Sequence, residues 1–266
     1  MVFIYNKSSI GFSHINNKMP CQDHSVSYGK DKIQVITACD GHGGNLYFRS
    51  NKGSKFASQA VIDVINLYSV HRLHKLIKSN KLDKLKLEIL CKWNELVEQD
   101  YSRKHFSKKE LDKLNEEELF KLANNYICAY GTTLNAAILT NKFIICIQIG
   151  DGGVYLINKN NIELAFPEND ENVANITNSM CADKAFDKIY IKAFYRYCYN
   201  GIIICTDGLL TPYQTYTNFK ENFIVPFLNN FKLITIDSIN KMNQFIEKIG
   251  LEIGTGDDVS IAATLY

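Results

Sequence analysis

The sequence is poor in arginine, in proline and in long apolar runs. Only four of its 30 basic residues are arginines, so lysine must supply most of the positive contacts to any anionic ligand. The four prolines are too dispersed to mark a linker. No segment approaches the ~18 apolar residues of a membrane span, and the first residues lack the basic and apolar regions of a secretory leader. These absences predict one soluble intracellular domain that spans residues 1–266.

Charge and cysteine content narrow the range of partners. The 30 basic and 28 acidic residues leave a net charge of +2, which gives no overall field that would favour nucleic acid or an anionic membrane. The eight cysteines are scattered without a C-x-x-C pair, and several lie within apolar runs. We therefore expect a cytoplasmic monomer in a reducing compartment that binds neither nucleic acid nor membrane.

The apolar pattern changes twice along the chain. Short β-type runs fill residues 1–39, helical spacing of apolar residues dominates from Ser54 to Asn124, and β-type runs return after Tyr126. A meander of antiparallel strands is expected over residues 127–166, and residues 108–125 are expected to be helical. Further strands are expected at 188–194, 201–207 and 259–266, and helices at 218–228 and 236–250. Because strands and helices come in blocks, the pattern predicts an α+β fold of two packed antiparallel sheets flanked by helices.

Aspartates stand at the ends of several predicted strands. Asp40, Asp151 and Asp207 each follow an apolar run and precede glycine, and the pair Asp257-Asp258 precedes the last strand. If these strands share one sandwich, their ends can bring the carboxylates together at one rim. Clustered carboxylates repel and raise one another's pKa unless cations neutralise them, and hard oxygen ligands select magnesium or manganese over zinc.

Each of these Asp-Gly pairs could instead be a hairpin turn, which this dipeptide favours. A hairpin requires a second strand directly after the turn, and neither Asp40 nor Asp207 is followed by one. At Asp151 an apolar run does follow at once, so a tight turn and a metal ligand are equally compatible with the sequence.

Six short motifs lie in an order that resembles the protein phosphatase 2C family of metal-dependent serine/threonine phosphatases. They are Cys21-Gln22-Asp23, Asp40-Gly41-His42-Gly43-Gly44, Gly131-Thr132-Thr133, Gly150-Asp151-Gly152, Thr206-Asp207-Gly208 and Gly256-Asp257-Asp258-Val259-Ser260. Together they span nearly the whole chain, and six in order are far more specific than any one alone. The family fold is a pair of antiparallel sheets flanked by helices, the αββα sandwich that the strand pattern also predicts.

The resemblance implies two or three Mn²⁺ or Mg²⁺ ions. Asp40 would bridge two ions and the Gly41 carbonyl would bind the second, whereas Asp207 and Asp257 would bind the first. Asp23 would act on the second ion through water, and Asp151 would form a third site with Asp207. A water shared by two ions would then attack the phosphorus of phosphoserine or phosphothreonine in a protein substrate.

The resemblance also implies roles for four residues beside the metal ligands. His42 corresponds to the general acid, and Lys18 stands where the family has a phosphate-binding arginine. Lysine would supply a point charge without the bidentate fork of arginine, although an ordinary surface lysine is an equal alternative. Gln22 stands where many members have glutamate. Gln22 and Asp258 are expected to lie beside the metal ligands and hold them in place without binding the ions themselves.

Other hydrolase classes fit the sequence less well. No cysteine has an arginine six residues later, which excludes the cysteine-based phosphatases, and neither a P-loop nor an H-E-x-x-H motif is present. Two alternatives on the same fold stay open. One is a pseudophosphatase that serves as a regulatory binding module, and the other is a hydrolase of small phosphate esters.

Overall fold

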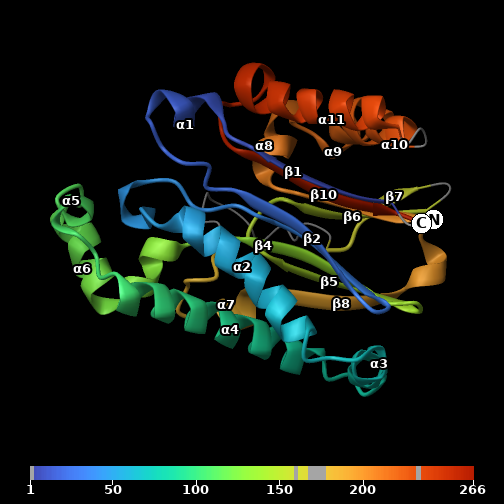
Figure 1. Ribbon diagram of the computed structural model, residues 1–266, viewed down its shortest axis with the longest axis horizontal. Helices are drawn as coiled ribbons and strands as arrows, with labels where there is room; N and C mark the ends of the chain where they lie inside the picture. The colour runs from blue at the N-terminus through green and yellow to red at the C-terminus, as the bar shows by residue number, and fades with distance from the viewer. Residues whose placement is uncertain (1–2, 159–160, 167–177, 232–234) are drawn as a thin grey trace.

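The centre of the molecule is a pair of five-stranded antiparallel sheets that pack face to face (Figure 1). The computed structural model describes residues 3–158, 161–166, 178–231 and 235–266. Sheet A has the order β1 (Phe3–Ser9), β10 (Val259–Leu265), β9 (Gly201–Cys205), β6 (Gly153–Ile157) and β7 (Ile162–Leu164). Sheet B has the order β2 (His24–Lys30), β3 (Ile33–Cys39), β4 (Leu134–Leu139), β5 (Phe143–Ile149) and β8 (Tyr190–Tyr195).

Helices cover the outer face of each sheet (Figure 1). Those beside sheet B are α2 (Ser50–Ile65), α3 (Val70–Lys78), α4 (Leu82–Arg103) and α7 (Ala185–Lys188). Those beside sheet A are α8 (Asp207–Leu210), α9 (Tyr216–Phe219), α10 (Val225–Phe231) and α11 (Ile236–Lys248), with π-helical turns at Lys220–Ile224 and Ile249–Ile253. The remaining helical pieces are α1 (Phe12–Asn16), α5 (Lys108–Leu111), α6 (Glu116–Asn124), and 3₁₀ turns at Asn45–Tyr47, Tyr126–Tyr130, Arg196–Cys198 and Thr211–Tyr213. The expected two-sheet sandwich flanked by helices is therefore confirmed.

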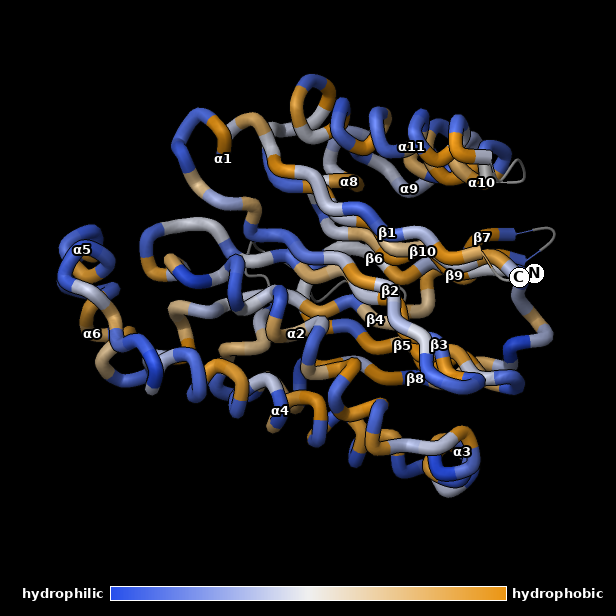
Figure 2. The backbone as a smooth tube through the Cα atoms, viewed as in Figure 1, coloured by the Kyte–Doolittle hydropathy of each residue, from blue (hydrophilic) through white to orange (hydrophobic). Residues whose placement is uncertain are grey.

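The central strands are apolar on both faces because both faces are covered. In β3, Val35 and Cys39 pack towards α2 and α4, whereas Ile36 and Ala38 pack between the sheets. Residues from β5 and β9 alternate in the same way, and Figure 2 shows apolar residues along the central strands but mixed polarity on the outer helices. Burial on two sides is why these strands appear as continuous apolar runs rather than alternating ones. Within the described residues, no helix has both the length and the apolar character needed to cross a bilayer.

The predicted meander over residues 127–166 is wrong in two respects. Residues Tyr126–Tyr130 form a 3₁₀ helix, and the strand begins only at Leu134. More importantly, β5 and β6 do not pair, because β5 belongs to sheet B and β6 to sheet A. Gly150 and Gly152 adopt φ angles of +91° and +88°, a left-handed backbone that lets the chain cross from one sheet to the other.

The segment expected to be helical over residues 108–125 forms two helices with an N-cap each. Ser107 and Glu110 make a capping box at the start of α5, and Asn115 and Glu118 make another at the start of α6. Each box satisfies backbone N–H groups at a helix start, so two short helices replace one long one.

A buried arginine joins this helical region to the chain that follows Asp40. Arg49 is only 3% exposed, and its Nε lies 2.9 Å from Oε1 of Glu110. Its Nη1 lies 3.4 Å from Oδ2 of Asp100 and donates a hydrogen bond of 2.7 Å to the hydroxyl of Tyr130. The guanidinium thus has the paired charges and acceptors that a buried cation requires.

Candidate active site

Asp40 directly follows β3 and is held by the Gly131-Thr132-Thr133 segment. The Asp40 N–H donates to the Thr133 hydroxyl at 2.9 Å, and the Asp40 carbonyl accepts from the Thr132 hydroxyl at 2.7 Å and from the Thr133 N–H at 2.8 Å. A Cβ added to Gly41 would lie 2.6 Å from the Gln22 carbonyl oxygen, so only glycine fits beside Asp40. This threonine motif was one of the six found in the sequence, but the sequence indicated no role for it. In the structure, its hydrogen bonds hold the Asp40 backbone in place.

Asp207 is the first residue of α8, immediately after β9 of sheet A. The preceding Thr206 accepts a hydrogen bond of 2.9 Å from the Ser260 N–H, and its hydroxyl donates to Oδ2 of Asp23 at 2.8 Å. A Cβ on Gly208 would lie 2.0 Å from the Asp258 carbonyl oxygen. Helix α8 therefore starts close against the Asp258 backbone, which fixes where the Asp207 side chain begins.

Asp151 occupies the crossover from β5 to β6. Its carbonyl accepts a hydrogen bond of 3.0 Å from the Asn135 side-chain amide. Because the strands before and after it belong to different sheets, Asp151 is not in a hairpin turn, and that alternative is wrong.

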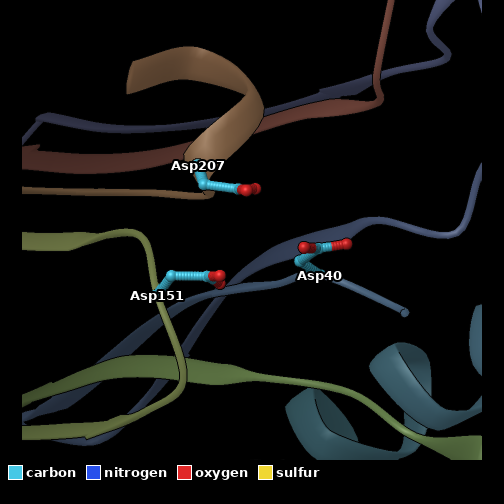
Figure 3. Close-up of side chains that lie close together, drawn as sticks. All are labelled: Asp40, Asp151 and Asp207. Carbon is cyan, nitrogen blue, oxygen red and sulfur yellow. The ribbon is translucent and has the colours of Figure 1, made fainter. Parts of the chain in front are cut away.

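Asp40, Asp151 and Asp207 point towards one another (Figure 3). One carboxylate oxygen from each lies within 4.8 Å of the others. Asp40 comes from the end of sheet B, Asp207 from the end of sheet A, and Asp151 from the chain that connects them. The convergence of these three strand-end aspartates, which the sequence predicted, is present in the structure.

The electrostatics of this cluster are unfavourable without a positive charge. Burial and then the charges of Asp23 and Asp207 raise the pKa of Asp40 well above its usual value. Burial and then the charges of Asp151 and Asp257 raise the pKa of Asp207 to about 6. Asp23 is also buried with a raised pKa, and its Oδ1 has no hydrogen-bond donor among the described residues. Crowded oxygen donors of this kind fit hard divalent cations such as Mg²⁺ or Mn²⁺.

Asp257 and Asp258 have different surroundings although they are neighbours in sequence. The Asp257 side chain is half exposed and lies outside the 4.8 Å trio, but its charge contributes to the raised pKa of Asp207. Asp258 is 2% exposed and accepts hydrogen bonds from the N–H groups of Gly11 at 2.8 Å and Gln22 at 2.5 Å. Its Oδ2 also lies 2.8 Å from Nδ1 of His14, a residue that the sequence left without a role. Asp258 thus anchors the N-terminal segment, whereas the Asp257 side chain is open to solvent.

The Gln22 side chain contacts the loop that contains His42. The Gln22 side-chain amide donates to the Ser50 hydroxyl at 2.6 Å and to the His42 carbonyl at 3.2 Å, so it braces the loop that contains His42. The His42 ring packs edge-on against Tyr47 with 5.1 Å between ring centroids. Burial lowers the pKa of His42, and the charge of Asp151 opposes that effect.

Lys18 lies in the exposed turn that follows α1. It adopts a φ of +54°, which is unusual for a residue with a side chain, and its side chain is accessible to solvent. The predicted contact of Lys18 with phosphate stays a prediction.

The architecture is similar to that of several solved phosphatases. A bacterial serine phosphatase is 18% identical, with a TM-score of 0.62 and coverage of 100% of this chain and 98% of that chain. The catalytic domain of the serine/threonine phosphatase PstP, solved with two manganese ions, is 14% identical with a TM-score of 0.61 and coverage of 99% and 97%. Stp1 from Staphylococcus aureus is 20% identical with a TM-score of 0.59 and coverage of 100% and 95%. At these identities the likeness establishes the fold.

Sequence comparison identifies the family. No curated protein matches the chain. A family model described as protein phosphatase 2C, however, matches residues 10–235, which include five of the six motifs, from Cys21-Gln22-Asp23 to Thr206-Asp207-Gly208. The resemblance seen in the motifs is thereby confirmed, and the chain belongs to the protein phosphatase 2C family.

Proposed function

We propose that this phosphatase hydrolyses phosphoserine and phosphothreonine in protein substrates and depends on two or three Mn²⁺ or Mg²⁺ ions. The observation that carries the proposal is the convergence of Asp40, Asp151 and Asp207, whose carboxylate oxygens lie within 4.8 Å of one another. A protein gains nothing in stability from three crowded, partly buried carboxylates unless cations neutralise them. The two manganese ions of the structurally similar PstP domain support the same choice of metal.

The proposed ligand set combines the three converging aspartates with the ligands that the family resemblance implies. Asp40 and Asp207 would hold cations between the two sheets, together with the Gly41 carbonyl and Asp257, and Asp151 with Asp207 would hold a third. Asp23, fixed by the Thr206 hydroxyl at 2.8 Å, would support them from the buried side. When bound, the cations would lower the pKa of a water molecule and neutralise charge on the phosphoryl oxygens.

The remaining residues would act on the substrate. Attack by water at phosphorus breaks the bond to the serine or threonine oxygen, and that alkoxide needs a proton as it departs. His42, in the loop after Asp40, would hold that proton on its ring and donate it to the leaving oxygen. Lys18 would place its ammonium group near the phosphate and reduce repulsion between the dianion and the acidic site.

The proposal extends to the setting in which the enzyme works. We place residues 1–266 in a single catalytic domain that acts as a monomer in the cytoplasm, in signalling through reversible phosphorylation. All eight cysteines are free, which supports a reducing compartment.

Steady-state hydrolysis with matched substrates tests this function. Initial rates should be measured on phosphoserine and phosphothreonine peptides, on small phosphate esters and on p-nitrophenyl phosphate, with Mn²⁺, with Mg²⁺ and with excess EDTA. Manganese binding should be measured separately by calorimetry. We expect turnover of phosphopeptides that requires the cation and disappears in EDTA.

Each other outcome has a distinct meaning. Full turnover in EDTA would contradict the metal-dependent mechanism. Higher kcat/KM on small phosphate esters than on phosphopeptides would reassign the substrate class. Manganese binding without hydrolysis of any substrate would indicate a regulatory binding module instead of an enzyme.

A further inference from the structure

Helix α1 exposes its apolar residues and directs a polar residue towards the protein. Phe12 and Ile15 lie three positions apart, on the same helix face, and are 46% and 49% exposed. Between them, Ser13 donates hydrogen bonds to the Gly256 carbonyl from its N–H at 3.0 Å and from its hydroxyl. Polar contacts therefore fix α1 to the protein, and its apolar residues contribute little buried surface to the fold.

The apolar surface of α1 continues onto a second segment. Leu251 and Ile253, in the π-helical turn that follows α11, are 41% and 49% exposed. Helix α1 lies beside this turn at the end of α11 (Figure 1). The Phe12 ring packs directly against the chain that leaves the turn, because a Cβ added to Gly256 would lie 2.5 Å from that ring. We refer to the four exposed residues as the α1 patch: Phe12, Ile15, Leu251 and Ile253.

The α1 patch borders the candidate active site. His14, within α1, has its Nε2 3.9 Å from Oδ1 of Asp257 and its Nδ1 2.8 Å from Oδ2 of Asp258. The Asp258 carbonyl in turn lies directly against Gly208, the residue after Asp207. The patch is thus continuous, through the segment that contains Asp257 and Asp258, with the site at which a substrate phosphate would bind.

We propose that the α1 patch binds apolar side chains that flank the phosphorylated residue of a peptide substrate. This inference rests on the proposed phosphatase function and adds a substrate class to it. An extended peptide advances about 3.3–3.6 Å per residue, so side chains about two to four positions from the phosphorylated residue can reach α1. Their contact with the patch removes apolar surface of both molecules from water, which favours phosphopeptides with apolar residues at these positions.

Charge and area favour a peptide over other occupants of the patch. The Glu252 carboxylate, within the π-helical turn, lies 3.8 Å from the Lys248 ammonium group, and bound cations would neutralise Asp257. Lys18, in the turn after α1, has the sign of charge that suits a phosphopeptide. Four half-exposed side chains offer roughly a few hundred Å², whereas a stable dimer buries about 800 Å² of each subunit. A short apolar peptide segment therefore fits the patch better than a second copy of the chain.

A pair of matched peptides tests the patch by direct binding. Both peptides contain a non-hydrolysable phosphonate analogue of phosphoserine and carry the same charge. One has leucine at the second to fourth positions on each side of the analogue, and the other has serine there. Fluorescence anisotropy in the presence of Mn²⁺ measures the Kd of each peptide. Burial of half of a leucine or isoleucine side chain corresponds to about three- to tenfold in Kd, so we expect the leucine peptide to bind the wild type at least tenfold more tightly.

Variants of the patch identify the residues responsible. Ile15→Ser/Ile253→Ser should reduce the preference for the leucine peptide by about tenfold, whereas Ile15→Leu/Ile253→Leu should retain it. Leu67→Ser is the matched control, because Leu67 is 70% exposed in the chain between α2 and α3 and lies outside the patch. The ratio of the two Kd values is compared within each variant, so a general loss of affinity or of folded protein cancels.

Three results of these measurements would overturn the proposal. They are equal binding of the two peptides by the wild type, a preference that survives in Ile15→Ser/Ile253→Ser, and an equal loss of preference in Leu67→Ser. A wild-type dimer in analytical ultracentrifugation that dissociates in the double serine variant would also contradict it, because the patch would then be a contact between copies of the chain.

Kinetic measurements separate this proposal from the proposed function. With phosphoserine peptides of the same two sequences, kcat/KM of the wild type should show the same preference for the leucine peptide. If the protein hydrolyses no phosphate ester with either cation, the proposed phosphatase function fails, and the ratio of Kd values still decides whether the patch selects apolar peptides.

Discussion

The carboxylate of Asp23 accepts a hydrogen bond of 2.8 Å from the hydroxyl of Thr206. Asp23 stands directly before β2 of sheet B and Thr206 directly after β9 of sheet A, so this contact joins the two sheets beside the aspartate cluster. The same hydroxyl accepts from the Ser260 N–H at 2.9 Å, which ties the last strand to the junction.

Thr206→Val should therefore destabilise the fold and weaken manganese binding. Valine keeps the shape of the side chain but leaves the Ser260 N–H and the buried Asp23 carboxylate without this partner, at a cost of about 1–3 kcal/mol. Urea unfolding and calorimetric titration with Mn²⁺ measure the two effects. Thr264→Val is the matched control on β10, because the Thr264 hydroxyl is buried without a hydrogen-bond partner among the described residues. Equal losses of stability and of manganese affinity in both variants would show that the hydrogen bond between Thr206 and Asp23 makes no specific contribution.

Asp207→Asn should abolish catalysis and make the metal-free protein more stable. Loss of a ligand should lower kcat by more than about 100-fold, because even residues behind metal ligands contribute about 10–100-fold. Removal of one negative charge also relieves the repulsion that raises the pKa of Asp40. Phosphopeptide kinetics with Mn²⁺ and urea unfolding in EDTA give the two readings. Asp237→Asn changes an exposed aspartate on α11 and should alter neither kcat nor the stability in EDTA. Retention of more than about a tenth of wild-type kcat would remove Asp207 from the ligand set.

His42→Ala should discriminate between substrates by their leaving groups. A serine alkoxide requires a proton as it departs, whereas nitrophenolate leaves readily without one. Proton donation typically contributes ~10²–10⁴-fold, so phosphoserine peptides should slow by that range while p-nitrophenyl phosphate is almost unaffected. An equal decrease on both substrates would mean that His42 orders the loop that it shares with Gly41, since its carbonyl accepts from Gln22.

Lys18→Ala should raise KM for phosphopeptides more than it lowers kcat. The ammonium group is expected to attract phosphate in both the ground state and the transition state, and loss of such uniform binding appears mainly in KM. Lys18→Arg should restore or improve binding, because a guanidinium can contact two phosphate oxygens. Lys32→Ala serves as the control at another exposed lysine. An unchanged KM in Lys18→Ala would assign Lys18 to the ordinary surface.

Glu110→Gln should reduce the loss of stability in acid. Although burial opposes it, the hydrogen bonds from Arg49 and Ser107 lower the pKa of Glu110 from 4.5 to about 2. A lowered carboxylate pKa means that Glu110 stabilises the fold above pH 4.5 and loses this contribution as the pH falls from 4.5 to about 2. Urea midpoints across this window should therefore decrease less steeply in the variant than in the wild type. Lys121 also lowers the pKa of Glu117, but this helix pair is exposed and screened by solvent, so Glu117→Gln should change the slope much less than Glu110→Gln.

The sequence was most informative where a local pattern is sufficient. Strands buried on two faces must be continuously apolar, so segments such as Ile33–Cys39 were identifiable, and Asp40 and Asp207 stood out because no strand follows them. The division of strands between sheets was not identifiable, since it depends on the left-handed turns at Gly150 and Gly152. Nor could the sequence separate Asp257 from Asp258 by exposure, because that depends on distant N–H groups at Gly11 and Gln22.

The crossover at Asp151 has a consequence for how the molecule resists unfolding. Asp40 belongs to sheet B and Asp207 to sheet A, and the backbone pairing of the described strands stays within each sheet. A cation bound by both residues would therefore crosslink two sheets whose backbones are not hydrogen-bonded to each other. Asp151 would add the chain that connects the sheets to the same crosslink. Removal of the cation would leave the two layers held together only by their packed apolar surfaces and by side-chain hydrogen bonds such as that between Thr206 and Asp23. The lifetime of the folded protein, and not only its activity, would then depend on the supply of divalent cations.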